Sequence, residues 1–294
     1  MVTRSRVDRA ADQFAKGDES VDDLDAVRIF RDARAPILRA FIDDLSPGLR
    51  PDAIGIAGRI KRISSIVRKC RRGRTRISAL EDLVGYRIVV RDLEAQKAFC
   101  DALASWPNAK RIRDYTSTPR PDGYRAVHII LEYDLADQSK GRIEIQVRTI
   151  WQHIWANTSE AFGLAVKEGG GPESIRNYLE ALSISAASLD ASGDVPAGWA
   201  TESGPSGLPY IATFDVRRRV VRGVTPFSDM EDALTALLIR ERADLLDAVL
   251  LLAESPRVLR ITHIGLFPQD LIRVLADIEP CLTGDQTRAL LSPA

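Results

Sequence analysis

The chain has 294 residues, of which 45% are hydrophobic, enough for one or two domains with a sizeable core and too many for general disorder. Its 41 Lys and Arg residues balance its 41 Asp and Glu residues, so any affinity for polyanions must come from a local patch. No apolar run is long enough to cross a bilayer, the N-terminus has no apolar signal core, and the three cysteines are scattered. We therefore expect a cytoplasmic protein with no membrane span, disulfide framework or structural zinc site.

The first part of the chain predicts helices and one strongly basic segment. Residues 1–24 are expected to form a polar N-terminal tail. From Asp25 to Ser46, apolar residues recur at helical spacing, which predicts one or two amphipathic helices, and Pro36 marks a break or a helix start. Residues 59–76 hold nine basic and no acidic side chains, and their apolar residues are spaced so that one helix face packs while the rest stays cationic.

The middle of the chain predicts strands that alternate with helices. Strands are expected at Tyr86–Val90, Ala126–Tyr133 and Arg142–Thr149, and helices at 94–105, 151–163 and 172–190. The third strand alternates strictly, with three apolar side chains on one face and Arg142, Glu144, Gln146 and Arg148 on the other. Such a strand is either solvent-exposed or lines a polar cleft. Elements in this order favour an α+β or α/β layered fold.

The C-terminal part begins with a change in composition. Ten of the 18 residues from 192 to 209 are Gly, Pro or Ser, which predicts a linker or a long loop. We expect residues 210–294 to form a C-terminal α/β extension that either pairs with the first sheet or folds beside it. Its expected elements are a hairpin (Tyr210–Val216 and Val220–Phe227), a helix (Asp229–Arg242), a buried strand (Ala248–Ala253), another strand (Leu259–Phe267) and a final helix.

Two groups of charged side chains suit phosphate chemistry. Arg59, Lys61 and Lys69 of the basic segment can hold a polyanion by charge-assisted hydrogen bonds, unless they form an ordinary solvated face or a nucleic-acid patch. Asp82 precedes one strand and Glu144 lies on the polar face of another. If those strands are neighbours, the two carboxylates can share a Mg²⁺ ion; otherwise they are unrelated surface acids.

The segment Pro119–His128 predicts a nucleotide contact. Its Pro-Asp-Gly turn delivers Tyr124 and His128 onto one face of the following strand, beside Arg120. An aromatic ring, an imidazole and a guanidinium suit a stacked base with its phosphates nearby. The alternative is a half-buried Tyr and a core His whose hydrogen bonds are satisfied. The pair Trp151 and Trp155 is expected to anchor the core.

Read together, six motifs resemble the synthetase domain of the RelA/SpoT alarmone synthetase family. They cover about residues 55–165, with a weaker similarity over 210–272. The motifs are GRIKRISSIVRK (58–69), EDLVGYRIVV (81–90), RIRDY (111–115), PRPDGYRAVH (119–128), RIEIQVRT (142–149) and WQHIWAN (151–157). The resemblance implies an α+β, nucleotidyltransferase-like synthetase domain over residues 25–191, with a mixed sheet flanked by helices.

The resemblance also implies an activity, the transfer of the β,γ-pyrophosphate of ATP to the 3′-hydroxyl of GDP or GTP, which makes (p)ppGpp. By position, the resemblance implies that Arg59, Lys61 and Lys69 bind the ATP phosphates and that Arg87 lies near the transferred group. It implies that Asp82 and Glu144 bind Mg²⁺ and that Glu144 also activates the hydroxyl. On the acceptor side, it implies that Tyr124 stacks on guanine, that Arg120 and His128 contact the acceptor phosphates, and that Gln146 and Arg148 complete the polar strand face.

Departures from the family pattern keep other readings open. The family usually has Lys and Asn where this chain has Arg120 and Asp122, and commonly has Glu where this chain has Asn157. One alternative is therefore a toxin that pyrophosphorylates the 3′ end of tRNA or an adenosine nucleotide. Another is a catalytically inactive nucleotide-binding module.

The sequence also bears on the chain's domains and partners. It has no His-Asp dipeptide, so the family's hydrolase domain is not expected, and we expect a stand-alone small synthetase. Three roles remain open for residues 210–294: packing on the catalytic sheet, joining copies into a homo-oligomer, or restraining the site.

Overall fold

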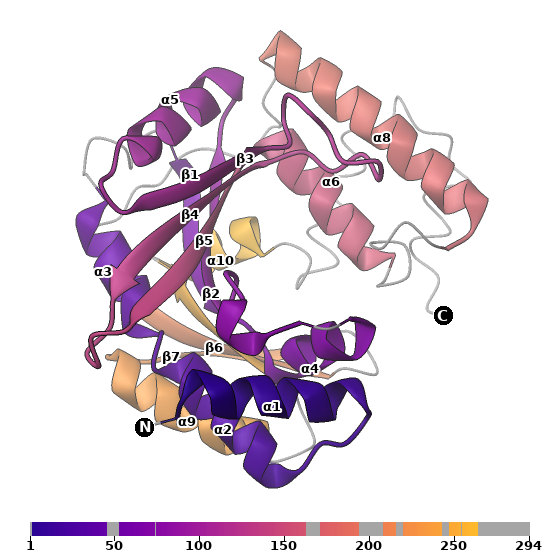
Figure 1. Cartoon of the computed structure of the whole chain (residues 1–294). Coiled ribbons are helices and arrows are strands. Elements are labelled where there is room, and N and C mark those ends of the chain that lie inside the picture. Colours follow the sequence, from indigo (N-terminus) through magenta and orange to yellow (C-terminus); the bar gives the residue numbers. More distant parts are fainter. Residues whose placement is uncertain are drawn as a thin grey trace.

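One mixed sheet of eight strands runs through the described part of the chain, with helices against both faces (Figure 1). The computed structural model describes residues 2–45, 53–73, 75–162, 171–193, 208–215, 220–242, 247–253 and 255–263. The strands are β1 (Ala53–Ile60), β2 (Val84–Val90), β3 (Ala109–Asp114), β4 (Val127–Asp134), β5 (Lys140–Thr149), β6 (Leu208–Asp215), β7 (Val220–Pro226) and β8 (Asp247–Ala253). The helices are α1 (Arg4–Ala15), α2 (Val21–Asp32), α3 (Pro36–Asp44), α4 (Ile63–Arg72), η2 (Ile77–Ala79), α5 (Leu93–Ala104), α6 (Ile150–Ala161), α8 (Glu173–Ser192), α9 (Met230–Arg242) and α10 (Pro256–Thr262).

The sheet has the strand order β3-β4-β5-β2-β1-β8-β6-β7. Strands β2 and β5 are parallel, and the other neighbouring pairs are antiparallel. A parallel pair needs a long crossover connection, which α5, β3 and β4 provide here. The predicted α+β fold, with a mixed sheet flanked by helices, is therefore confirmed.

The C-terminal region extends the same sheet. Strand β8 pairs with β1 from Ala57 opposite Ala253 to Arg59 opposite Leu251, and the β6–β7 hairpin continues from β8. Of the two arrangements that the sequence left open, the described strands thus pair with the first sheet. The predicted linker at 192–209 and the predicted final helix lie almost wholly outside the described residues, so the boundary between the two predicted domains stays a prediction.

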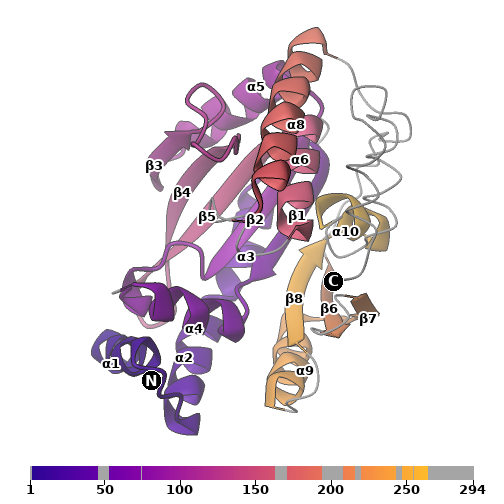
Figure 2. The ribbon, with the colours of Figure 1, turned by 90° about the vertical axis from the view of Figure 1, so that its right-hand side faces the viewer.

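Each face of the sheet buries its own apolar cluster. One face packs against α3, α5 and α9 through residues such as Phe41, Phe99 and Leu237. The other face packs against α6 and α8, with Trp151 and Trp155 buried there as expected, and against α10 (Figure 2). Because side chains alternate along a strand, this double cover explains why β2 is buried at every residue. Among the described helices, none has the length and apolar character needed to cross a bilayer.

The predicted polar tail over residues 1–24 is wrong. Residues 4–15 form α1, capped by Thr3, and residues from Val21 onward form α2. Helix α1 buries a narrow stripe that includes Val7 and Phe14 against α4 and η2, and its other faces are charged. A stripe this narrow leaves the segment polar on average, so composition alone did not reveal the helix.

The basic segment divides between a strand and a helix. Helix α4 begins at Ile63, so Arg59 lies at the end of β1 and Lys61 in the short connection between them. The predicted single helix over 59–76 is therefore wrong at its start. Apart from Arg59, the strand β1 is made of Ala, Gly and Ile, and hydrogen bonds to β2 and β8 on its two sides override any helical spacing.

Two further elements differ from the predictions. The edge strand β3 was not predicted, because its residues are charged and mostly exposed. The predicted strand at 259–267 begins as the end of helix α10, whose Ser255 side chain accepts a hydrogen bond from Val258 and which has Pro256 in its first turn. The remaining predicted strands and helices of residues 86–190 and 210–253 are confirmed, with shifted ends.

Helix α10 lies so close to β1 that Gly55 has no room for a side chain. A Cβ atom at Gly55 would come within 2.9 Å of the Thr262 Cγ2 atom and within 3.5 Å of Val258 Cγ1. Gly55→Ala should therefore lower the free energy of unfolding, by about 1–3 kcal/mol, because α10 must shift off the sheet. Urea denaturation measures the change. Gly223→Ala in β7 is the matched control, since its Cβ would meet no atom closer than 3.9 Å. Equal effects of the two substitutions would contradict the tight approach.

Candidate active site

The parallel register of β2 and β5 brings the predicted site residues into rows across the sheet. Gly85 of β2 stands opposite both Glu144 of β5 and Arg59 of β1. Two residues further along the strands, Arg87 stands opposite Gln146. Gln146 in turn stands opposite His128 of β4. Residues that stand opposite one another on neighbouring strands share a face. The pairing therefore gathers side chains from segments that are far apart in the sequence.

A small pocket opens where these rows meet the segment before β2. It is lined by Arg59, Asp82, Gly85, Tyr86, Arg87, Glu144 and Gln146. Gly85 is required there, because a Cβ atom on it would come within 2.9 Å of the Glu144 carbonyl oxygen. Five of the residues predicted from sequence thus line one pocket, with two carboxylates and two guanidinium groups among them.

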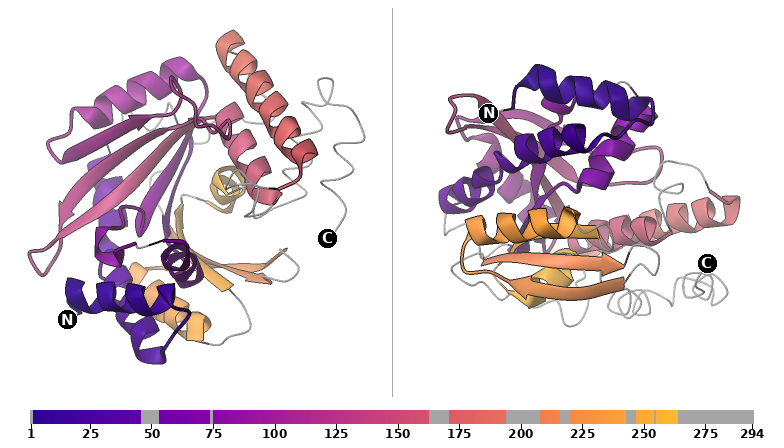
Figure 3. Two further views of the ribbon diagram at one scale, coloured as in Figure 1. Left: turned by 45° about the vertical axis from the view of Figure 1, so that its right-hand side comes forward. Right: turned by 90° about the horizontal axis from the view of Figure 1, so that it is seen from below.

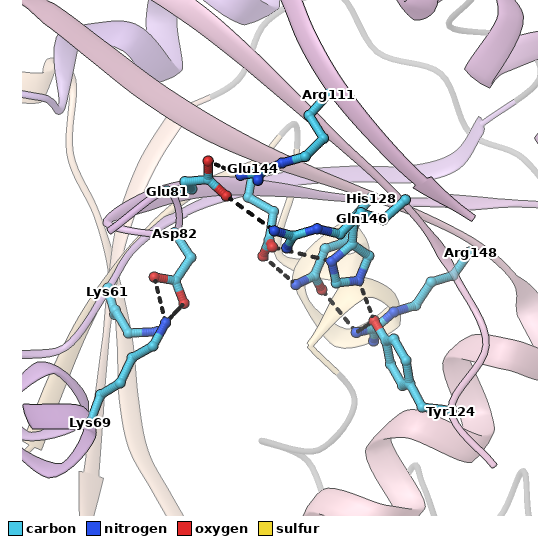
Figure 4. Close-up of polar contacts among 11 residues, drawn as sticks. Lys61, Lys69, Glu81, Asp82, Arg111, Tyr124, His128, Glu144, Gln146 and Arg148 are labelled. Atoms are coloured by element: carbon cyan, nitrogen blue, oxygen red, sulfur yellow. Dashed lines mark hydrogen bonds and ion pairs between the residues drawn. The ribbon is translucent and has the colours of Figure 1, made fainter. Parts of the chain in front are cut away.

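Two lysines surround the carboxylate of Asp82 (Figure 4). The Lys61 ammonium donates to Asp82 Oδ2 at 2.6 Å, and the Lys69 ammonium donates to Asp82 Oδ1 at 3.4 Å. Burial raises the pKa of Asp82, but the two ammonium groups outweigh it and hold that pKa below its ordinary value. Burial likewise lowers the pKa of Lys61, and Asp82 opposes this shift. Lys61 and Lys69 therefore contact the pocket through their hydrogen bonds to Asp82, which lines it.

Five side chains from β4, β5 and the preceding turn form a closed circuit of hydrogen bonds (Figure 4). Glu144 contacts His128 Nδ1 through Oε1 at 3.1 Å, and His128 Nε2 lies 2.7 Å from the Tyr124 hydroxyl. The Arg148 guanidinium donates to the Tyr124 hydroxyl at 2.9 Å and to Gln146 Oε1 at 2.8 Å. The Gln146 amide donates back to Glu144 Oε2 at 2.7 Å. A neutral imidazole with its proton on Nδ1 satisfies every contact.

This circuit keeps Glu144 ionised. Burial raises the pKa of Glu144, but the donors His128 and Gln146 outweigh it and lower the pKa to about 2. A carboxylate that accepts two hydrogen bonds in a largely buried site is held as the anion. Glu144 is therefore charged at neutral pH, and the lone pairs not used by His128 and Gln146 can bind a cation or accept a proton.

Two buried arginines, Arg148 within the circuit and Arg87 beside it, lie on this face of the sheet. Arg87 donates to the Thr262 carbonyl oxygen of α10 at 2.7 Å, and its pKa is lowered to about 9 by burial and by the nearby charge of Arg148. Among the described residues, Arg148 Nε and Nη1 are buried and have no hydrogen-bond partner. Buried donors without partners are rare and costly. An acceptor that reached these nitrogens would remove that cost.

The turn before β4 presents an aromatic surface. Gly123 has a φ of 86°, and the Asp122 carboxylate accepts a hydrogen bond from the Tyr124 amide at 3.1 Å. The Arg120 guanidinium lies 5.8 Å from the ring centres of both Tyr115 and Tyr124, outside the circuit. The sequence prediction placed Arg120 and Tyr124 here but missed Tyr115, although it lies in the RIRDY motif.

Asp82 and Glu144 have the donor chemistry that a magnesium ion prefers. They line the same pocket, and the low pKa values of both carboxyl groups keep both ionised. In the described part of the chain, no three His, Cys, Asp or Glu residues gather as a complete metal site. Magnesium commonly binds one or two carboxylates and takes its other ligands from water and substrate phosphates, so a two-carboxylate donor set is suitable.

The chain also matches known proteins. Residues 58–170 match the family model described as "Region found in RelA / SpoT proteins". The GTP pyrophosphokinase YjbM of Bacillus subtilis is 29% identical over 144 residues, which cover 46% of this chain and 67% of that protein. The probable chloroplastic GTP diphosphokinase CRSH of Arabidopsis thaliana is 28% identical over 165 residues, 52% of this chain but 28% of that protein. The crystal structure of small alarmone synthetase 2 from Bacillus subtilis has a TM-score of 0.48 at 23% identity, covering 56% of this chain and 93% of that one.

The pKa of Glu144 predicts how stability depends on pH. Because the folded-state pKa of about 2 lies below the ordinary value of 4.5, the ionised carboxylate stabilises the fold above pH 4.5, and this contribution is lost as the pH falls towards 2. The difference in unfolding free energy between the wild type and Glu144→Gln should therefore shrink by up to about 3 kcal/mol as the pH falls from about 5 towards 2.

Urea titrations at several pH values measure this difference. Glu180→Gln, on an exposed position of α8, is the control and should follow the wild type at every pH. A constant gap between the wild type and Glu144→Gln across the range would show that the circuit does not lower the pKa of Glu144.

Proposed function

Residues 58–170 are a RelA/SpoT region, and from this premise we propose that the protein transfers the β,γ-pyrophosphate of ATP to the 3′-hydroxyl of GDP or GTP, making (p)ppGpp. One observation carries the proposal: Asp82 and Glu144 share a pocket with Arg59 and Arg87. Pyrophosphate transfer requires little covalent help from the protein, since it depends on positioning, a divalent cation and cationic groups around the phosphates. The cytoplasm stays the predicted compartment.

The donor nucleotide is assigned to the cationic side of the pocket. Arg59, Lys61 and Lys69 approach it from β1, the following connection and α4. A triphosphate placed there would take over the hydrogen bonds that Lys61 and Lys69 now give to Asp82. The Asp82 carboxylate would then be released for a magnesium ion. Arg87, between the two carboxylates and α10, is assigned to the transferred group.

The acceptor nucleotide is assigned to the side of Tyr124. Its base would lie against the Tyr124 ring, and Arg120, His128 and Arg148 would face its phosphates. The Arg148 guanidinium already lies 5.2 Å from the centre of the Tyr124 ring. The unpartnered nitrogens of Arg148 would gain acceptors from an anion. Gln146 holds both Glu144 and Arg148 in place from the middle of the circuit.

Glu144 is assigned as the group that takes the proton from the attacking hydroxyl. His128 and Gln146 each donate one hydrogen bond to a Glu144 carboxylate oxygen, and the remaining lone pairs would accept the hydrogen bond and then the proton of the acceptor hydroxyl. Asp82 and Glu144 would together hold Mg²⁺, which neutralises charge on the phosphates when bound.

The direct test offers acceptors separately to the purified protein. With Mg²⁺ and γ-labelled ATP, label should appear on GDP or GTP. Asp82→Asn and Glu144→Gln should each lower turnover by a factor of at least about 100, because each removes a carboxylate from the pocket. Asp134→Asn, on an exposed position at the end of β4, is the control and should keep wild-type activity.

Other labelled products would change the assignment. Label on tRNA alone would support the tRNA-modifying alternative, and label on an adenosine nucleotide would support the adenosine alternative. Binding of ATP without transfer to any acceptor would support the inactive nucleotide-binding module. Full activity of either carboxylate variant would remove that carboxylate from the mechanism.

Asp122 departs from the family pattern by putting negative charge two residues from the Tyr124 ring, where it would oppose an acceptor phosphate. Its carboxylate also holds the turn by accepting from the Tyr124 amide. Asp122→Asn keeps that acceptor and removes the charge. The variant should lower the KM for GTP by a factor of about 2–5, because the acceptor phosphates no longer meet an anion at a partly exposed site.

Steady-state kinetics with GTP as the varied substrate measure this change. The KM for ATP should stay as in the wild type, which serves as the internal control. A KM for GTP that is unchanged or higher would show that Asp122 does not oppose acceptor binding.

A further inference from the structure

One buried carboxylate links the C-terminal extension, through Arg31, to Lys61 on the donor side of the pocket. Glu241, near the end of α9, accepts two hydrogen bonds from Arg31 of α2, at 2.7 and 2.9 Å. The Glu241 side chain is 6% exposed and the Arg31 side chain 1%. Figure 3 shows α9 lying between the N-terminal helices and the C-terminal strands, where this pair forms. A bidentate arginine–carboxylate pair this deeply buried is strongly oriented.

Arg31 also holds the backbone of Lys61. The same Nη1 atom that binds Glu241 donates to the Lys61 carbonyl oxygen at 3.2 Å. The Lys61 amide donates to the Leu83 carbonyl oxygen at 2.8 Å. Lys61 is therefore fixed on both sides of its Cα atom, between Arg31 and the segment that carries Asp82. Its side chain extends from this fixed point to Asp82.

Glu241 is the buried counterion that keeps Arg31 in this place. Burial lowers the pKa of Arg31, but Glu241 and Asp32 outweigh it and raise that pKa above its ordinary value. The Asp32 carboxylate receives only the Arg31 Nε–H, at 2.7 Å, and is more exposed. Without the Glu241 charge, the guanidinium would be buried with one partly exposed partner, so it would turn towards water and release Lys61.

We propose that Glu241 is a positioning residue for the donor nucleotide, acting through Arg31 on the backbone of Lys61. The proposal rests on the function proposed above. It makes the C-terminal extension part of the synthetase site rather than an attached module. A second contact from the same region agrees with this role, since the Thr262 carbonyl oxygen of α10 holds Arg87 on the other wall of the pocket.

The test separates positioning from stability. Glu241→Gln should weaken the binding of a non-hydrolysable ATP analogue, measured by calorimetry without acceptor, by a factor of about 10, because a displaced Lys61 no longer meets the phosphates. The KM for ATP should rise by a similar factor, while the KM for the acceptor changes by less than about twofold. Glu241→Asp, which keeps the charge with a shorter reach, should fall between wild type and Glu241→Gln.

Asp23→Asn provides the matched control. Asp23 pairs with Arg6 in the same helical layer and has a side chain that is 12% exposed, but none of its contacts reaches Lys61. This variant should lose thermal stability as Glu241→Gln does and bind the analogue as the wild type does. If both variants weaken binding equally, or if Glu241→Gln binds normally, the positioning role is wrong.

The outcome also separates this proposal from the proposed function. A wild-type protein that binds no ATP analogue overturns the donor assignment itself. A wild type that binds and transfers, with no selective defect in the Glu241 variants, overturns only the positioning role. If Glu241→Gln does not fold, Glu241→Asp decides, since it must still raise the KM for ATP more than Asp23→Asn does.

Discussion

The parallel register between β2 and β5 is the constraint on which the candidate site depends. Side chains alternate along a strand, so a slip of one residue would turn Glu144 and Gln146 into the apolar core and bring Ile145 into the pocket. The apolar face prevents this slip, because Ile143, Ile145 and Val147 are completely buried. The hydrophobic core thus fixes the position of the carboxylate that the proposed chemistry needs.

The same arrangement explains how a chain with no net charge gathers cations. Arg87, Arg148 and Lys61 are buried or nearly so, and their burial is costly unless each finds an acceptor. Asp82, the circuit around Glu144 and the α10 carbonyl oxygen supply acceptors, but within the part of the chain that the structure describes two nitrogens of Arg148 have none. Part of the cost is therefore left for an anionic ligand to offset, which favours binding of phosphates over water.

Features of the site that depend on neighbouring residues in the sequence could be predicted, and features that depend on contacts between distant segments could not. The alternation of β5 is a local pattern, so its polar face followed from residue types. Whether β5 lies beside the strand that follows Asp82 stayed open in the sequence, and only the parallel pairing of β2 with β5 decides it. Arg59 was placed on a helix because the spacing of neighbouring apolar residues fits both structures, and only pairing with β2 and β8 decides between them. The contact between Arg87 and Thr262 joins residues 175 positions apart, and no local pattern marks a carbonyl oxygen as its partner.

The position of β8 gives the C-terminal extension its importance. Without β8, β1 would be an edge strand, with Arg59 next to unpaired backbone groups that exchange readily with water. With β8 in place, the backbone around Arg59 is hydrogen-bonded to strands on both sides. Cationic groups that hold phosphates act best on rigid elements, because any freedom must be lost again on binding. Pairing of β8 with β1 and the Arg31–Glu241 pair restrict the donor side of the pocket, and the α10 carbonyl oxygen restricts Arg87 on the other wall. A change in the extension would therefore alter the geometry of the pocket, since the two share these contacts.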